Sequence, residues 1–169
     1  SLLSKLMPEG MAGSLSTLPG SYGIPPPDKS AVGAMRKQLV SAAEHLERIY
    51  EQCGRDIVLA VEPEPDCLWS SAAEFADFWQ KELAPVPAAK RHIGLCYDTS
   101  HHELAAGPVG TGLGTCLRSG MRIGKIHLSA ALGAPDFASK DALANFADEV
   151  YLHQTKAFKN DGTAVGFQD

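Results

Sequence analysis

The sequence predicts an α/β protein whose core is a parallel sheet. Short apolar runs alternate along the chain with segments that have helical spacing or helix caps, an order typical of βαβ units. Three of these runs, at residues 56–61, 93–97 and 122–129, end in side chains that can bind a cation. Because α/β folds place their sites at the carboxyl ends of parallel strands, we expect these side chains to lie near one another.

The first predicted strand covers residues 14–18 and is interrupted by Pro19 and Gly20. A short polar loop carrying Ser21 and Tyr22 follows it. Such a loop either lines a binding site with hydroxyl and backbone groups or is a plain turn. Both interpretations are compatible with the sequence, and the binding interpretation makes Ser21 and Tyr22 candidate substrate-binding residues.

One helix is predicted before the second strand and another after it. Apolar residues recur every three or four positions over residues 30–53, which is typical of one face of a long amphipathic helix. Ser71 and Glu74 have the spacing of a capping box at the start of a second helix. We expect Pro85 and Pro87 to end that second helix, because proline cannot continue it.

Carboxylates follow the second strand, and carboxylates and imidazoles follow the third. Glu62 and Glu64 come directly after residues 56–61 and alternate with prolines, which hold them at the end of the strand. Asp98 ends the apolar run 93–97, and His101 comes three positions later. The alternative interpretation is that Asp98 only caps the next helix, with the histidines on its solvated first turn.

The rest of the chain is predicted to continue the same pattern. We expect a glycine-rich loop, a short helix that ends at Gly120, and a strand over residues 122–129 that carries His127 near its end. A further extended segment at residues 149–155 carries His153, another candidate for substrate binding. The segment from residue 156 onward is predicted to be a polar tail.

The strand-end residues form a set suited to a divalent cation. Glu62, Asp98, His101 and His127 supply oxygen and nitrogen ligands of the type that bind Zn, Mn or Fe in catalytic sites, with Mg as a further candidate. Glu62 is also the candidate catalytic carboxylate. The neighbouring His102 is assigned an indirect role or a surface position.

Composition excludes several classes of function. The 169 residues are 44% hydrophobic and 21% charged, as in an ordinary globular domain, so we expect a single domain over residues 1–169. A net charge of −5 argues against nucleic-acid binding, and no apolar run is long enough for a membrane span. The four cysteines form no CxxC pair, so we expect reduced, mostly buried thiols in a cytoplasmic protein.

Five motifs together resemble a known superfamily: STLPGSYG, LAVEPEPDC, CYDTSHHELA, KIHLSAAL and VYLHQ. They are similar to the xylose-isomerase-like TIM barrels, which include sugar phosphate isomerases and epimerases and the type IV apurinic endonucleases, and most of all to the EboE-type metabolite traffic proteins. The resemblance implies a (β/α) barrel in which Glu62, Asp98, His101 and His127 bind metal or substrate.

An eight-stranded barrel needs about 200 to 250 residues or more, so the resemblance implies that this chain covers about half to two-thirds of a barrel, roughly strands four to seven. Such a fragment has unpaired sheet edges, and we expect it to pair as a homo-oligomer or with the missing remainder of the barrel. The substrate expected from the resemblance is a small sugar or polyol derivative.

Three functions follow from the resemblance. The first is a metal-dependent sugar or sugar-phosphate isomerase or epimerase. The second is a metabolite-binding or traffic barrel without catalysis. The third, a phosphodiesterase of the apurinic endonuclease type, needs a basic groove for phosphates, and the net charge of −5 argues against it.

Overall fold

The structure is a computed structural model of the 169-residue chain. It describes residues 2–22, 28–106, 111–134, 140–146, 155–159 and 163–168. The chain divides into two compact units, Ser1–Leu128 and Ser129–Asp169. The first unit contains a parallel four-stranded sheet in the order β1-β2-β3-β4, so the predicted α/β class with a parallel sheet is confirmed.

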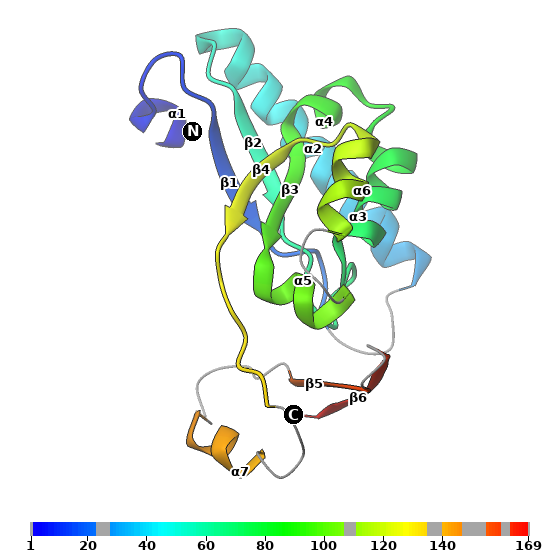
Figure 1. Cartoon of the computed structure of the whole chain (residues 1–169). Coiled ribbons are helices and arrows are strands. Elements are labelled where there is room, and N and C mark those ends of the chain that lie inside the picture. Colours follow the sequence, from blue (N-terminus) through cyan, green and yellow to red (C-terminus); the bar gives the residue numbers. More distant parts are fainter. Residues whose placement is uncertain are drawn as a thin grey trace. The chain divides into compact units, whose positions relative to one another are not determined.

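The strands of the first unit are β1 (Gly13–Thr17), β2 (Ile57–Val61), β3 (Ile93–Asp98) and β4 (Ile123–His127). Its helices are α1 (Leu2–Leu6), α2 (Lys29–Cys53), α3 (Ala72–Phe78), the π-helical turn η1 (Trp79–Leu83), α4 (Pro87–His92), α5 (Thr99–Ala106) and α6 (Thr111–Ser119). Figure 1 shows α2, α3, α4 and α6 on one side of the sheet. None of the helices in the described ranges is long and apolar enough to cross a membrane.

The long helix α2 begins and ends as its sequence predicts. Asp28 is its N-cap and accepts a hydrogen bond from the backbone N–H of Ala31 at 2.8 Å. Gly54 follows it in the left-handed region, with a φ of 66°, and its N–H donates to the Tyr50 carbonyl. The buried residues of the helix are Leu39, Ala43, Leu46 and Ile49, so Ala43 takes the place on the buried face that the spacing predicted for Ala42.

Helix α3 has the predicted capping box, with Ser71 accepting from the N–H of Glu74 and Glu74 accepting from the N–H of Ser71. The role expected for Pro87 was wrong. It is the first residue of α4, a position where a helix tolerates proline because its missing N–H has no partner there. The chain therefore places an additional short helix before β3.

The two faces of the sheet have different side chains. The face covered by the helices is called the outward face. Its residues on β3, which include Leu95 and Tyr97, pack with α2, α3 and α6 in the main hydrophobic core. On the opposite, inward face the residues are small where neighbouring strands approach most closely. A Cβ on Gly94 would lie 2.5 Å from the carbonyl oxygen of Arg122 and 2.9 Å from Cγ1 of Val58, and a Cβ on Gly124 would also lie 2.9 Å from that methyl group.

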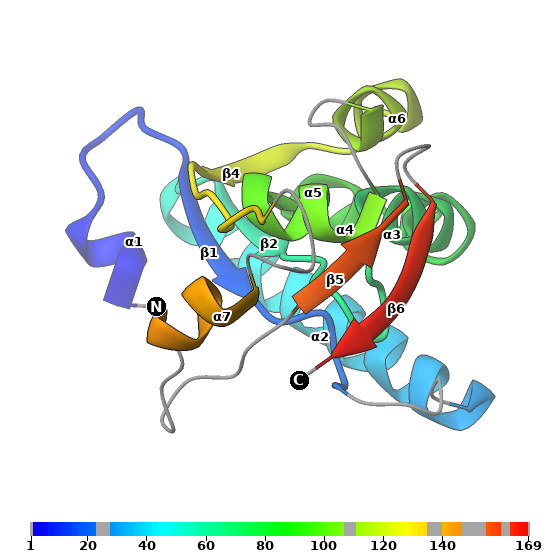
Figure 2. The same cartoon turned by 60° about the horizontal axis from the view of Figure 1, so that its bottom comes forward.

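These glycines allow the sheet to curl strongly. Figure 2 shows the four strands arranged around a curve, with β1 and β4 near each other and the helices outside. Across the inside of the curve, Nζ of Lys125 in β4 donates to Oγ of Ser16 in β1 at 3.0 Å. The arrangement is compatible with part of an α/β barrel.

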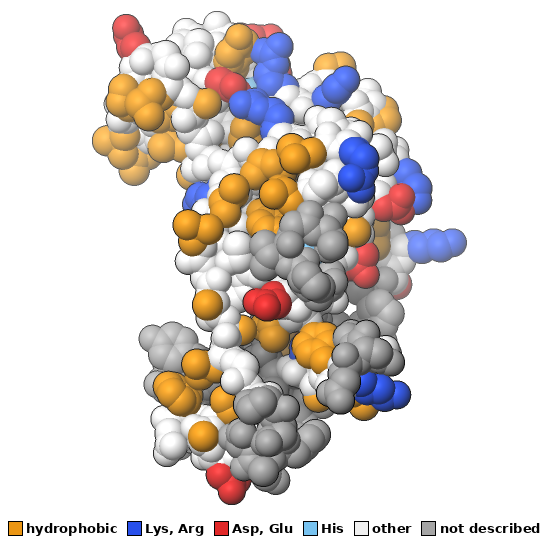
Figure 3. Space-filling model, viewed as in Figure 1, with side chains coloured by type: hydrophobic (Ala, Val, Ile, Leu, Met, Phe, Trp, Pro, Cys, Tyr) orange, Lys and Arg blue, Asp and Glu red, His pale blue; other side chains and the backbone are white. Residues whose placement is uncertain are grey.

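The edge strands β1 and β4 each pair with one strand within the described residues. Apolar side chains lie exposed on and near these edges: Leu2, Leu6, Met11, Leu15, Leu18, Ile126 and Leu128. Figure 3 shows hydrophobic side chains gathered over α1 and β4 on one face of the molecule. The expectation that such edges pair with a second copy or with further strands stays a prediction.

The second unit contains α7 (Lys140–Leu143), the 3₁₀ turn η3 (Ala144–Phe146), and the strands β5 (Thr155–Phe158) and β6 (Ala164–Gln168). The sequence predicted a polar tail with a turn at Asn160, Asp161 and Gly162 but no strands there, whereas β5 and β6 pair antiparallel. Apolar residues on both sides of this Asn-Asp-Gly segment are a signal for a hairpin. The extended segment predicted at 149–155 lies outside the described residues except for Thr155.

We predict that Gly94→Ala destabilises the protein, because the added methyl group would collide with backbone and with Val58 in the closest part of the sheet. Overpacking of this kind costs about 1–3 kcal/mol. The matched control is Gly33→Ala in α2, where a methyl group meets open space and should stabilise the helix by about 0.5–1 kcal/mol. Urea denaturation of both variants measures the difference, and equal effects would contradict the proposed close approach.

A second prediction concerns the ion pair between Asp56 and Arg122, whose two hydrogen bonds measure 2.8 and 2.9 Å. These hydrogen bonds hold the pKa of Asp56 below its ordinary value. The stabilisation is therefore present above the unfolded-state pKa of about 3.9 and is lost as the pH falls through the lower folded-state pKa.

Asp56→Asn should lower the free energy of unfolding at pH 7 by about 1 kcal/mol or less, since solvent screens this half-exposed pair. The difference from the wild type should shrink as the pH falls below about 4. Asp77→Asn, which removes the more exposed pair with Lys81, is the control and should change the stability less. A constant Asp56→Asn effect across the acid range would contradict the assignment.

Candidate metal centre

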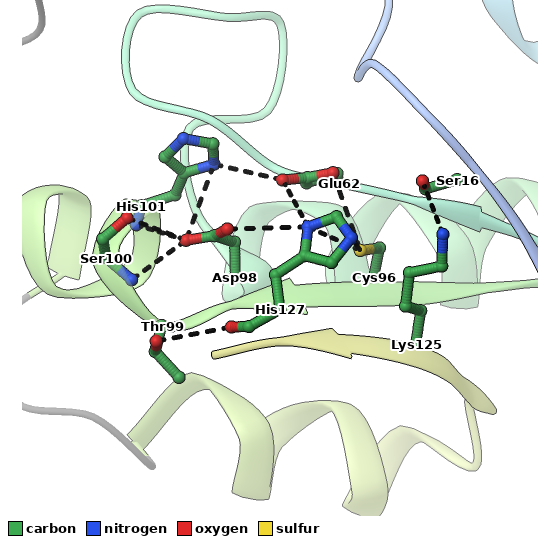
Figure 4. Close-up of polar contacts among 9 residues, drawn as sticks. All are labelled: Ser16, Glu62, Cys96, Asp98, Thr99, Ser100, His101, Lys125 and His127. Carbon is green, nitrogen blue, oxygen red and sulfur yellow. Dashed lines mark hydrogen bonds and ion pairs between the residues drawn. The ribbon is translucent and has the colours of Figure 1, made fainter. Parts of the chain in front are cut away.

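Four of the predicted site residues come together at the carboxyl end of the parallel sheet (Figure 4). Glu62 directly follows β2, Asp98 is the last residue of β3, and His127 is the last residue of β4. His101 lies in the first turn of α5. The backbone N–H of Glu62 donates to the Thr17 carbonyl at 3.0 Å, so this residue is still held in the sheet ladder.

The ligand atoms of these residues lie within a few ångströms of one another. Nδ1 of His127 is 3.1 Å from Oε1 of Glu62 and 3.5 Å from Oδ2 of Asp98. Nδ1 of His101 is 3.4 Å from the same Glu62 oxygen and 4.0 Å from Oδ1 of Asp98. The Glu62 carboxylate thus lies between the two imidazoles.

A register shift in the sheet brings His127 to this face. Leu95 pairs with Ile123, but the next residue, Cys96, pairs with Lys125, so β4 contains one extra residue at this point. As a result Asp98 pairs with His127. Directly opposite residues on neighbouring strands point to the same face, which places the imidazole beside the carboxylates.

Asp98 also caps α5. Its Oδ1 accepts hydrogen bonds from the N–H of Ser100 at 3.0 Å, the N–H of His101 at 3.1 Å and the hydroxyl of Ser100 at 2.9 Å. The alternative interpretation of the sequence, in which Asp98 is a helix cap, is therefore confirmed for the carboxylate. It does not hold for the imidazoles, since His101 is only 25% exposed and His102 only 4%.

His102 has a buried position that the sequence analysis did not assign to it. Its ring packs against Tyr97 with 5.0 Å between centroids and a tilt of 38° between the ring planes. Gly112 of α6 lies so close that a Cβ there would be 2.5 Å from Cε1 of the imidazole. The surface position suggested for His102 was wrong, because the helix α5 turns this side chain toward the core. It packs between β3 and α6.

Cys96 joins the group, although the sequence analysis treated it only as a buried thiol. The thiol donates to Oε2 of Glu62 at 3.6 Å, and Sγ lies 3.6 Å from Nδ1 of His127. Burial and the Glu62 carboxylate raise the pKa of the Cys96 thiol to about 12, so the pair with His127 is not an activated cysteine nucleophile. The strand alternation was an available signal, because Cys96 and Asp98 are two residues apart.

Glu64 lies beside the cluster in the loop after β2. Burial raises the pKa of Glu64, and the charges of Glu62 and Asp98 raise it further, while His101 opposes them. The loop is tightly folded: the N–H of Glu64 donates to the Trp69 carbonyl at 3.3 Å, and Asp66 has a φ of 64° in the left-handed region. Asp tolerates this region better than most residues, so Asp66 suits this backbone conformation.

The loop that carries Ser21 and Tyr22 packs against the Glu64 loop. The carbonyl of Ser21 accepts from the N–H of Leu68 at 2.8 Å, and Tyr22 forms an isolated antiparallel bridge with Cys67. The Tyr22 side chain is 52% exposed. The third residue assigned to substrate binding, His153, lies outside the described residues.

The residues present fit a divalent metal. Two groups have ligand atoms within 4.8 Å of one another: Glu62, Asp98 and His101, and Glu62, Cys96 and His127. Nδ1 of His101 is buried and has no hydrogen-bond partner in the part of the chain that the structure describes. Imidazole and carboxylate ligands suit Zn, Mn or Fe, whereas Mg prefers oxygen alone.

Two comparisons with known proteins found no match. No protein-family model matched the chain, and no curated protein matched it. Any function must therefore be argued from the chemistry of the site.

We predict that His101→Ala weakens binding of Zn²⁺ or Mn²⁺ by more than about tenfold, since even indirect partners of metal ligands have effects on that scale. It should change stability little, because His101 is partly exposed. His102→Ala should do the reverse, since it removes a buried ring and leaves a cavity that costs about 2 kcal/mol or more.

Calorimetric metal titration and urea denaturation of the two variants provide the measurements. Equal losses of metal affinity in the His101 and His102 variants would contradict the assignment of ligands.

Proposed function

We propose that this protein is a divalent-metal-dependent isomerase or epimerase that acts on a sugar, a sugar phosphate or a related polyol. The observation that carries the proposal is the convergence of Glu62, Asp98, His101 and His127 at the carboxyl edge of a parallel sheet. This is the edge at which α/β folds place their catalytic residues. The resemblance of the strand-end EP and DTSH motifs and of His127 to the xylose-isomerase-like proteins, which include sugar isomerases, favours the same reaction class.

These four residues would hold the cation, which when bound polarises a carbonyl group and its neighbouring hydroxyl and stabilises negative charge on their oxygens. The chain prepares the position in two ways. The cap of α5 fixes the backbone of His101 relative to Asp98, and the sheet ladder fixes Glu62 and His127. Ligands that are fixed before binding lose less conformational entropy when the cation enters.

Isomerisation also requires a group that moves a proton between adjacent carbons. The sequence predicted Glu62 for this step. Because the Glu62 carboxylate lies between the imidazoles of His101 and His127, we assign Glu62 to ligation instead. We propose Glu64 for the proton transfer, since its carboxylate interacts with Glu62, Asp98 and His101 but forms no part of the two ligand groups.

The polar groups around the site suit a polyol. Sugar hydroxyls donate hydrogen bonds, and the carboxylates of Glu62, Glu64 and Asp98 accept them. Ser21 and Tyr22 belong to the loop that packs against the Glu64 loop, and their hydroxyl groups would add donors and acceptors.

The proposal is tested by measuring the metal content of the purified chain and then screening aldose–ketose pairs with Mn²⁺, Co²⁺, Zn²⁺ and Mg²⁺. We expect turnover that chelation abolishes and that the metal restores. Asp98→Asn keeps the helix cap and should lose the metal at this position and turnover together. Glu103→Gln, which changes an exposed carboxylate on the same helix, is the matched control and should keep both.

Glu64→Gln should keep the metal and lower kcat about 100-fold or more, the scale of general acid–base catalysis. Metal binding without turnover on any pair would contradict the isomerase proposal and favour a metabolite-binding barrel. A chain that binds no divalent metal would contradict both the metal centre and the reaction.

A further inference from the structure

The position of Cys96 is not explained by a single metal at the four predicted ligands. The side chain is fully buried on the inward face of β3, two residues before Asp98. In Figure 4 its sulfur lies between Glu62 and His127, on the side of Glu62 away from His101. Glu62 directs Oε2 toward Cys96 at 3.6 Å and Oε1 toward His101 at 3.4 Å. Oε1 also lies 3.1 Å from Nδ1 of His127, so one oxygen of Glu62 faces Cys96 and the other faces the two imidazoles.

The distances in the Cys96 group match those of a tetrahedral zinc site. With Zn–S of about 2.3 Å and Zn–N or Zn–O of about 2.0–2.2 Å, tetrahedral angles separate sulfur from nitrogen or oxygen by about 3.5–3.7 Å. Sγ of Cys96 lies 3.6 Å from Nδ1 and 3.7 Å from Nε2 of His127, and 3.6 Å from Oε2 of Glu62. The ligand atoms are therefore spaced as for one shared ion, and the His127 ring, whose two nitrogens are about equally far from the sulfur, has to rotate to direct one nitrogen at that ion.

We propose that Cys96, His127 and Glu62 form a second metal-binding position, next to the position formed by Glu62, Asp98 and His101. The inference rests on the proposed function in one respect, because Glu62 and His127 belong to the metal centre of the isomerase. It adds a thiolate ligand and a second ion, which the four strand-end residues alone did not predict.

The thiolate determines which metals this position accepts. Sulfur ligands select borderline and soft ions such as Zn²⁺ and Co²⁺, whereas Mg²⁺ and Ca²⁺ require oxygen ligands. The position of Asp98 and His101 has only oxygen and nitrogen ligands and would also accept Mn²⁺. The two positions would thus differ in the ions they prefer while sharing one carboxylate.

Titration of the intact chain with Co²⁺ tests the proposal, because cobalt bound to a thiolate shows an intense charge-transfer absorption in the near ultraviolet. We expect two equivalents of cobalt and this absorption in the wild-type protein. Cys96→Ser should lose the absorption and one equivalent and keep the other. Asp98→Asn should keep the absorption and lose the other equivalent, and Glu62→Gln should weaken both positions.

Cys116→Ser is the matched control, since Cys116 is equally buried but bonds to the Ala72 carbonyl, and it should keep both equivalents. If Cys96→Ser does not fold, the wild-type spectrum still decides, because its thiolate absorption is either present or absent. One equivalent without the absorption would overturn the second position and leave the isomerase proposal standing. An absorption that persists in Cys96→Ser would assign the thiolate to another cysteine and overturn it too.

The opposite outcome, in which the reaction fails but the second position is present, can also be recognised. Two equivalents with the thiolate absorption, but no turnover on any aldose–ketose pair, would support the second position and contradict the proposed reaction.

Discussion

The carboxyl edge of the sheet depends on one constraint, which is the burial of two carboxylates side by side. Glu62 and Asp98 are 12% and 8% exposed. Buried carboxylates are costly unless neighbouring groups compensate their charge. The surroundings provide that compensation: two imidazoles lie against Glu62, and backbone and hydroxyl groups of α5 donate to Asp98. A divalent cation would add positive charge at the same point, which is the physical reason for assigning one to the site.

Much of the fold and the core of the site could be predicted from the sequence, because both depend on local patterns. The spacing of apolar residues located α2, and Ser71 with Glu74 located the start of α3. Polar residues after apolar runs identified the strand ends, and parallel strands bring such ends to one edge. Glu62 and Asp98 were therefore identifiable as neighbours although 35 residues separate them in the chain.

Features that depend on packing between distant segments were not predictable in the same way. Strand alternation places Cys96 on the same face as Asp98, but its contact with His127 depends on the neighbouring strand. The contact of His102 with Gly112 likewise depends on the position of α6. Helix α4 was missed because proline ends helices more obviously than it begins them, and Pro87 does the latter. The pairing of β5 with β6 was missed because both strands are short and only partly apolar.

The extra residue in β4 shows how a ligand could be added to such a site. In a regular parallel pair, Asp98 would face Ile126, and His127 would point to the opposite side of the sheet. One inserted residue exchanges the side chains that point inward with those that point outward over the remainder of the strand. A strand of a parallel sheet can therefore gain or lose a ligand through a single codon insertion or deletion, without any substitution at the histidine itself. Sequence alignments that forbid a gap between Ile123 and Lys125 would pair His127 with an outward position and hide its relation to the site.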